Sequence, residues 1–175
     1  MVWSNENTMI KSYSQCGQDL YAYEKSNRKD SGVYIEIGAY DPVDISNSYM
    51  LELIGWSGLS FEIAGIEGQW KGSRKNTLIR CDARHFDFKS CFQENNIPLE
   101  IDYLSLDIDD GSLDSLNILP LDTYRFKCIT IEHDEYHRGS DMKNEMRRIL
   151  YGYGYTLDRP DVANDGFIYE DWWIS

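Results

Sequence analysis

The stretch VYIEIGAYD, residues 33–41, decides the fold class. Its first five residues are mostly β-branched, aromatic or apolar, which is typical of a buried strand, and Gly38 ends the run. Similar apolar runs recur along the chain and alternate with segments of helical periodicity. Strands are expected at 33–37, 59–63, 77–81, 101–109, 127–132, 155–157 and 167–174. Helices are expected at 18–24, from 46 or 47 to 53, at 88–95, at 113–119 and from 140 or 141 to 152–154.

Strands that alternate with short helices predict an α/β fold with a mostly parallel sheet. The last two expected strands are separated by a turn at Asn164-Asp165-Gly166 and can add one antiparallel strand near the edge. The chain has 175 residues, without an internal repeat or a linker. The length predicts a single domain over residues 1–175.

Composition excludes several classes of protein. Lys plus Arg number 17 and Asp plus Glu number 30, so the net charge is −13, which argues against a nucleic acid or an anionic membrane as partner. No apolar run approaches the length of a membrane span, and residues 1–10 lack the pattern of a signal peptide. The four cysteines are scattered and form no zinc or redox motif. A cytoplasmic protein with reduced thiols is expected.

Acidic residues follow each of the five strands expected before residue 133. In an open parallel sheet, ligands bind beyond the carboxyl ends of the strands. A single acid at such a position usually caps a helix or faces solvent, but acids from five strands at one edge predict a binding site. These acids are Glu36 and Asp41, then Glu62, then Asp82, then Asp107, Asp109 and Asp110, and finally Glu132 and Asp134. Repulsion among these acids raises their pKa values and destabilises the fold, so a function is expected to compensate for the lost stability.

The turn after residues 33–37 distinguishes between cofactors. A dinucleotide site needs G-x-G-x-x-G, whereas this turn has Gly38 alone, with Asp41 and Asp44 where an anion would bind. The turn therefore counts against NAD or FAD and suits a ligand with a positive centre, such as S-adenosylmethionine. Glu62 is expected to accept from the ribose hydroxyls and Asp82 from the adenine amino group.

These residues resemble the FkbM-type family of S-adenosylmethionine-dependent methyltransferases. The matching stretches are 14–19, 34–41, 46–52, 55–62, 102–109, 129–134 and 170–173, and the likeness covers about residues 12–175. The resemblance implies a single Rossmann-like class I methyltransferase domain with a seven-stranded sheet whose last strand is antiparallel. It also implies that residues 1–30 form an N-terminal cover segment. Pro42 departs from the family pattern, because it stands where the family's first loop often has glycine, so the resemblance does not predict the path of this loop.

The resemblance and the strand ends together give a set of expected cofactor-binding residues. The set is Gln15, Glu36, Gly38, Tyr40, Asn47, Glu62, Asp82 and Asp107. Members of the family commonly methylate oxygen, often on sugars or other small polar metabolites. The expected partner is therefore a small-molecule acceptor, with carbohydrate as one candidate, and a second copy of the chain could help to wall its site.

Transfer of a methyl group to an alcohol needs a base that takes the hydroxyl proton. His133 is the expected base, because it follows a strand directly and its ordinary pKa suits neutral pH. Period-two alternation should also bring Asp107, Asp109 and Glu132 together. These acids could accept hydrogen bonds from the acceptor and the cofactor ammonium, or bind Mg²⁺. No metal ligand is assigned. The candidate catalytic residues are His133, Asp107, Glu132 and Asp109.

Two other functional classes stay open at this point. One is a nicotinamide-dependent oxidoreductase on a similar sheet, against which the missing glycines after Gly38 speak. The other is a non-catalytic binding module that retains the fold, against which the acids at the strand ends speak.

Overall fold

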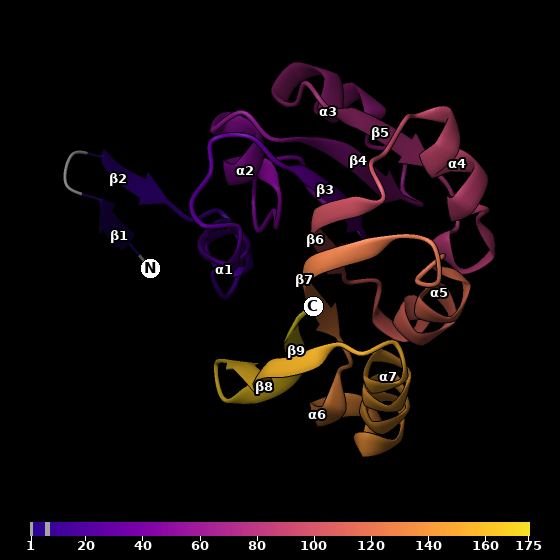
Figure 1. The fold of residues 1–175 in the computed structure, drawn as a ribbon. Helices are drawn as coiled ribbons and strands as arrows, with labels where there is room; N and C mark the ends of the chain where they lie inside the picture. The colour runs from indigo at the N-terminus through magenta and orange to yellow at the C-terminus, as the bar shows by residue number, and fades with distance from the viewer. Residues whose placement is uncertain (1, 6–7) are drawn as a thin grey trace.

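The computed structural model describes residues 2–5 and 8–175, and a seven-stranded sheet forms its centre (Figure 1). The strand order is β5-β4-β3-β6-β7-β9-β8. The strands of this sheet are β3 (Val33–Ile37), β4 (Ser57–Glu62), β5 (Thr77–Arg80), β6 (Glu100–Leu106), β7 (Arg125–Glu132), β8 (Thr156–Asn164) and β9 (Phe167–Ile174). All pairs are parallel except those that β9 makes with β7 and β8. The expected α/β fold with one antiparallel strand near the edge is confirmed.

The strand order reverses beside β3. The chain runs outward from β3 through β4 to β5 and then returns to β6, which pairs with the other side of β3. At such a reversal the connections after the two central strands leave in opposite directions, and a crevice forms at the carboxyl ends of the strands. Gly38 follows β3 and Asp107 follows β6, so both lie at this crevice.

Helices cover both faces of the sheet (Figure 1). Apolar side chains of α1 (Gln18–Lys25) and α2 (Tyr49–Leu53) bury Tyr34, Tyr103 and Trp172 on one face. On the other face, β3, β6 and β7 contribute Ile37, Leu104 and Ile131 to a larger core, and all three are fully buried. The helices that cover this face are α4 (Phe88–Glu94), α5 (Ser112–Ile118) and α7 (Ser140–Gly152).

The smaller elements lie around this frame. They are α3 (Glu67–Ser73), α6 (Glu135–Arg138), the 3-10 turns η1 (Ala83–His85) and η2 (Asp109–Gly111), and a two-stranded sheet of β1 (Val2–Asn5) and β2 (Thr8–Lys11). Figure 1 shows this hairpin extending from the body of the protein. No helix among the residues just described is both long and apolar enough to cross a membrane.

Several expected boundaries were wrong. The strand expected over 101–109 ends at Leu106, because Asp109 adopts a left-handed conformation with φ of 50° and begins a 3-10 turn. Ser105, Asp107 and Asp109 therefore do not share one strand face. The strand expected at 155–157 is instead the long edge strand β8, which runs through Pro160 with shifted register against β9. An edge strand tolerates proline because one side of its backbone is unpaired.

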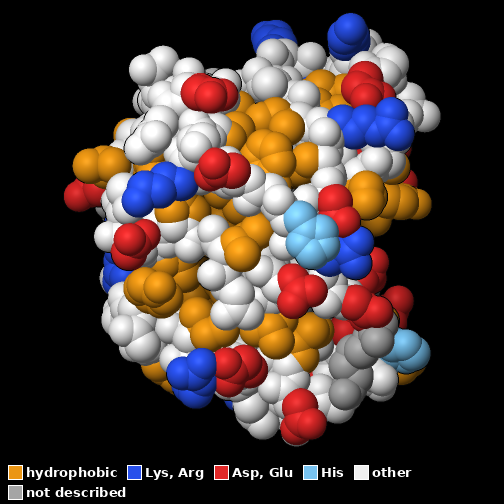
Figure 2. All heavy atoms as spheres, turned by 90° about the vertical axis from the view of Figure 1, so that its right-hand side faces the viewer, with side chains coloured by type: hydrophobic (Ala, Val, Ile, Leu, Met, Phe, Trp, Pro, Cys, Tyr) orange, Lys and Arg blue, Asp and Glu red, His pale blue; other side chains and the backbone are white. Residues whose placement is uncertain are grey.

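Acidic side chains dominate part of the surface. Figure 2 shows the right-hand side of Figure 1, and acidic side chains gather in its lower right part. The net charge of −13 gives the protein a negative electrostatic field.

Candidate functional site

A cavity of about 410 Å³ lies at the carboxyl ends of β3, β4, β6 and β7. Most residues that the sequence nominated for the site line it. They are Gln15, Glu36, Gly38, Tyr40, Asn47, Glu62, Asp107, Asp109 and Glu132. Ile45, Ser46, Ile63 and Ile108 also line the cavity and were not nominated. Among the residues that the structure describes, no lysine or arginine lines this cavity.

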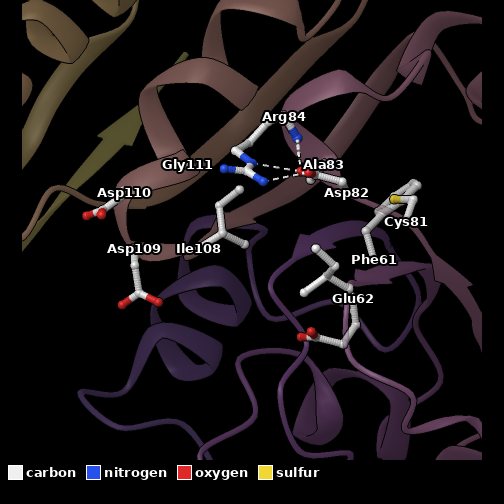
Figure 3. Close-up of a pocket in the computed structure, with 11 residues that line it drawn as sticks. Phe61, Glu62, Cys81, Asp82, Ala83, Arg84, Ile108, Asp109, Asp110 and Gly111 are labelled. Atoms are coloured by element: carbon white, nitrogen blue, oxygen red, sulfur yellow. Dashed lines mark hydrogen bonds and ion pairs between the residues drawn. The ribbon is translucent and has the colours of Figure 1, made fainter.

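A second cavity of about 290 Å³ adjoins the first (Figure 3). Both are lined by Glu62, Ile63, Ile108 and Asp109, so the two form one elongated depression. Phe61 and Cys81 add an apolar wall to the second cavity. Four acids and Arg84 also line the second cavity, so both parts of the depression are acidic, and Glu62 lies where they join.

Gly38 allows the backbones of β3 and β6 to meet closely at the floor of the first cavity. Its φ is +93°, and a Cβ atom at this position would lie 1.7 Å from the carbonyl oxygen of Asp107. The Gly38 amide donates to the carbonyl oxygen of Phe61 at 2.9 Å. A side chain at residue 38 is therefore excluded by both the backbone conformation and the available space.

Glu62 is held in a fixed orientation by two backbone amides. Its Oε2 accepts from the amide of Tyr40 at 2.8 Å, and its Oε1 accepts from the amide of Ala64 at 2.8 Å. Since each carboxylate oxygen has two lone-pair positions, both oxygens retain an acceptor site for a ligand. This arrangement suits the binding of a diol.

Two buried polar side chains line the first cavity. Glu36 is 1% exposed and accepts from Ser60 Oγ at 2.7 Å and from Ser46 Oγ at 3.5 Å. Asn47 donates through Nδ2 to Ser105 Oγ at 3.0 Å. Its Oδ1 is buried and has no hydrogen-bond partner within the described residues. A buried acceptor without a partner is unfavourable, so this atom suits a donor on a ligand.

Arg74 is a residue that sequence reasoning missed. Its side chain is fully buried and forms an ion pair with Glu52 at 2.8 Å. The guanidinium also donates to the carbonyl oxygen of Pro42 at 3.0 Å, to Ser46 Oγ at 3.3 Å and to Ser48 Oγ at 2.7 Å. Arg74 therefore fixes the loop after β3, including the segment around Pro42.

Asp107 and Glu132 form a half-buried acidic pair. Burial raises the pKa of both carboxyl groups, and the proximity of Asp107 raises the pKa of Glu132 further. The amide of Asp109 donates to Glu132 Oε2 at 2.9 Å. Carboxylate oxygens of Asp109, Glu132 and Asp134 lie within 4.8 Å of one another. This geometry fits either of the two expected roles, acceptance of hydrogen bonds or binding of a hard cation.

His133 lies apart from the other catalytic candidates. Its imidazole is fully buried, Nδ1 accepts from the amide of Glu135 at 3.3 Å, and Nε2 lies 3.7 Å from Asp171 Oδ1. It lines neither of the two cavities. Successive side chains at the end of a strand point to opposite faces, so Glu132 and His133 diverge. The role of His133 as a base stays a prediction that this placement does not favour.

Asp82 lines the second cavity, but its carboxylate already accepts hydrogen bonds from Arg84. Arg84 donates to Oδ1 through Nε at 2.8 Å and to Oδ2 through Nη2 at 2.6 Å (Figure 3). Contacts with the guanidinium hold the pKa of Asp82 below its ordinary value. Oδ1 also accepts from the Arg84 amide at 3.1 Å, whereas Oδ2 keeps a further lone pair, so a contact with an amino group remains a prediction.

The fold is shared with solved methyltransferases. A TehB-like S-adenosylmethionine-dependent methyltransferase from Corynebacterium glutamicum matches 90% of this chain and 86% of its own, with a TM-score of 0.60 and 9% identity. Fibrillarin from Aeropyrum pernix, solved with S-adenosyl-L-methionine, matches 99% of this chain and 82% of its own, with a TM-score of 0.54 and 13% identity. An rRNA methylase from Streptococcus thermophilus matches 96% of this chain and 99% of its own, with a TM-score of 0.51 and 13% identity.

The sequence itself matches no family model and no curated protein. Identities of this size establish the fold alone. The chain has the Rossmann-like α/β fold of these methyltransferases, with its cavities at the carboxyl ends of the central strands.

Proposed function

We propose that residues 1–175 form one S-adenosylmethionine-dependent methyltransferase domain. The observation that carries this proposal is the arrangement of Gly38 and Glu62 around one depression. Gly38 lets the backbones of β3 and β6 meet closely at the floor of the first cavity, and Glu62 presents two oriented oxygens where the first cavity joins the second. A ribose diol on Glu62 would direct the adenine toward the second cavity and the amino-acid part toward the first.

The charge of the first cavity supports a cationic ligand. Glu36, Asp107 and the unpartnered Oδ1 of Asn47 could hold the ammonium group. When bound, S-adenosylmethionine supplies a methyl group already activated by its sulfonium, so the protein has to align the acceptor and exclude water. A pyrophosphate would meet carboxylates here without a compensating cation, which disfavours a nicotinamide dinucleotide.

Glu62→Ala is expected to weaken the binding of S-adenosylhomocysteine at least tenfold. The substitution removes a charge-assisted hydrogen-bonding pair worth about 1.5–3 kcal/mol, and tenfold corresponds to about 1.4 kcal/mol. Isothermal titration calorimetry on the parent and the variant measures the change. Glu67→Ala is a matched control, because Glu67 is an acid that lines neither cavity of the proposed site and is expected to leave the affinity unchanged.

Two results would contradict the cofactor proposal. Thermal stabilisation of the parent by NAD but not by S-adenosyl compounds would favour the oxidoreductase. The absence of binding of any of these nucleosides would favour a non-catalytic module.

We propose further that the acceptor is a small uncharged or cationic molecule methylated on oxygen, for which a sugar is a fitting class. The resemblance to FkbM-type methyltransferases supports an oxygen acceptor. Fibrillarin and the rRNA methylase share the fold, but an RNA acceptor requires lysine and arginine to neutralise phosphates. The lining of the first cavity is acidic and the net charge is −13, so both have the same sign as RNA phosphates and would repel them.

Transfer of a radiolabelled methyl group is expected to sugars or other polyhydroxylated compounds, including amino sugars, and not to RNA. The measurement compares a panel of such compounds with total ribosomal and transfer RNA at physiological salt. Neutral acceptors avoid the repulsion that phosphates meet at an acidic surface. Labelling of RNA above that of a heat-denatured control would overturn the proposed acceptor class and leave the proposed cofactor intact.

A further inference from the structure

A short segment before α1 borders the first cavity. We call residues 12–17 the strap. Gln15 of the strap lines the cavity, and a parallel β-bridge joins Ser14 to Ile45, another lining residue. Ile45 has φ of +50°, a strained conformation for a β-branched residue, which persists only where neighbouring contacts enforce it. The bridge to the strap is such a contact.

Asp19 organises the strap from the first turn of α1. Its side chain is fully buried, and its carboxylate accepts from Ser12 Oγ at 2.6 Å and from Ser14 Oγ at 2.7 Å. The same carboxylate accepts from the amide of Tyr13 at 2.8 Å and from that of Leu20 at 2.7 Å. Three of these four donors belong to the strap. Hydrogen bonds to a charged acceptor are stronger than neutral ones, so Asp19 determines the conformation of this segment.

The end of the strap is fastened to α1 and β9. The amide of Cys16 donates to Gln18 Oε1 at 2.7 Å, and the hydroxyl of Tyr169 donates to Cys16 Sγ at 2.9 Å. Gln18 Nε2 donates to the same hydroxyl at 3.3 Å. Gly17, with φ of +88°, joins the strap to α1 and has open space around it. The strap can therefore pivot at Gly17 once the contacts to Asp19 are lost.

We propose that Asp19 is a positioning residue that holds the strap against the cofactor cavity and thereby sets the rate of cofactor release. The inference rests on the proposed function. A ligand in the cavity contacts Gln15 and Ile45 only when the strap is in place, so ligand binding and strap order stabilise each other. Asp19 does not line the cavity, and it acts through its hydrogen bonds to Ser12, Tyr13 and Ser14.

Asp19→Asn tests this proposal, because it keeps the size of the side chain and removes its charge. We expect the Kd of S-adenosylhomocysteine to rise about tenfold or more, mainly through faster dissociation, as is usual when contacts around a bound ligand are lost. Biolayer interferometry separates the two rates. Hydrogen exchange should show lost protection of the amides at 12–17, whereas those of β3 and β6 stay protected.

Asp102→Asn is the matched control. Asp102 is also buried, accepts from the amide of Val33 at 2.9 Å and lies near the amino end of β6, away from the cavity. Lys29 and Lys127 pair with it at 2.6 and 2.8 Å. This variant should lose thermal stability and keep the parent's Kd within about twofold, since it leaves the strap untouched.

The outcomes separate the possible explanations. Equal rises in Kd for Asp19→Asn and Asp102→Asn would overturn the proposal, because both would then act through global stability. If Asp19→Asn does not fold, the double variant Ser12→Ala/Ser14→Ala removes two donors and is expected to give the same faster dissociation; unchanged dissociation would overturn the proposal. If the parent binds no S-adenosyl compound, the proposed function fails, while exchange at 12–17 still reports whether Asp19 orders the strap.

Discussion

Gly38→Ala is expected to abolish binding of S-adenosylhomocysteine, with a loss of affinity of about 100-fold or more. The new Cβ atom would lie 1.7 Å from the Asp107 carbonyl oxygen, so β3 and β6 would have to move apart at the cavity floor. The positive φ of residue 38 adds roughly 1 kcal/mol of strain. Calorimetry with S-adenosylhomocysteine measures the affinity, and thermal unfolding without ligand measures the accompanying loss of stability.

Two glycine variants serve as controls for this result. Gly154→Ala also places a Cβ at positive φ but meets no atom within 4 Å, so it isolates the strain. Gly58→Ala creates a contact of 2.3 Å with the Tyr34 carbonyl oxygen near the amino end of β4, so it isolates a clash away from the cavity. Under conditions in which both variants are folded, both should bind S-adenosylhomocysteine with the affinity of the parent. Normal binding by Gly38→Ala would show that the crevice is not the cofactor site.

Glu132→Gln is expected to stabilise the protein at alkaline pH and to slow methyl transfer about 10²–10⁴-fold. Burial and Asp107 raise the pKa of Glu132 above its ordinary value of 4.5, so the folded protein binds this proton more tightly than the unfolded chain. The parent therefore loses stability as pH rises above the ordinary value, and this loss grows up to the raised pKa. The variant cannot ionise at residue 132 and should be more stable by about 1–2 kcal/mol at pH 8.

Urea unfolding between pH 5 and pH 9 measures this difference without any substrate. Glu145→Gln is the control, because Glu145 is a partly exposed acid on α7 that pairs with Arg148. Glu145→Gln should leave the pH dependence of the free energy of unfolding as steep as in the parent. A Glu132→Gln variant that loses stability with pH as steeply as the parent would show that this carboxyl group does not hold a proton in the folded state.

The same variant tests the chemistry once an acceptor is known. Once Glu132 loses its proton at alkaline pH, its carboxylate is a stronger base than an ordinary one and can take the proton of a hydroxyl, and such groups contribute about 10²–10⁴ in rate. Glu132→Gln should therefore lower kcat by about that factor. His133→Asn should have a smaller effect, because His133 lines neither cavity. The reverse order would restore His133 as the base.

The sequence predicted the composition of the site because parallel strands bring their carboxyl ends to one edge. Glu62, Asp107 and Glu132 are far apart in the chain, yet each follows or ends a strand, and strand order alone places them around Gly38. That part of the site depends on topology rather than on details of packing, so local patterns were sufficient to find it.

The remaining parts of the site depend on contacts that local patterns do not encode. Arg74 lies in a polar, glycine-containing segment and reaches the loop after β3 through a buried ion pair that only the folded chain shows. The alternation of apolar and polar residues continues to Asp109, but the strand ends at Leu106 because Asp109 begins a 3-10 turn. His133 was nominated because it directly follows a strand and its ordinary pKa suits neutral pH, although alternation at the end of β7 already separates its side chain from that of Glu132.

The insertion of β9 between β7 and β8 has a consequence for biosynthesis. Tyr169, which fastens Cys16, belongs to β9 and leaves the ribosome more than 150 residues after its partner. A nascent chain can assemble β3 to β7 and still lack the hydroxyl that anchors the N-terminal segment. Cofactor retention should consequently begin only after β9 has emerged, since Tyr169 and Cys16 must meet before the strap is anchored at its end.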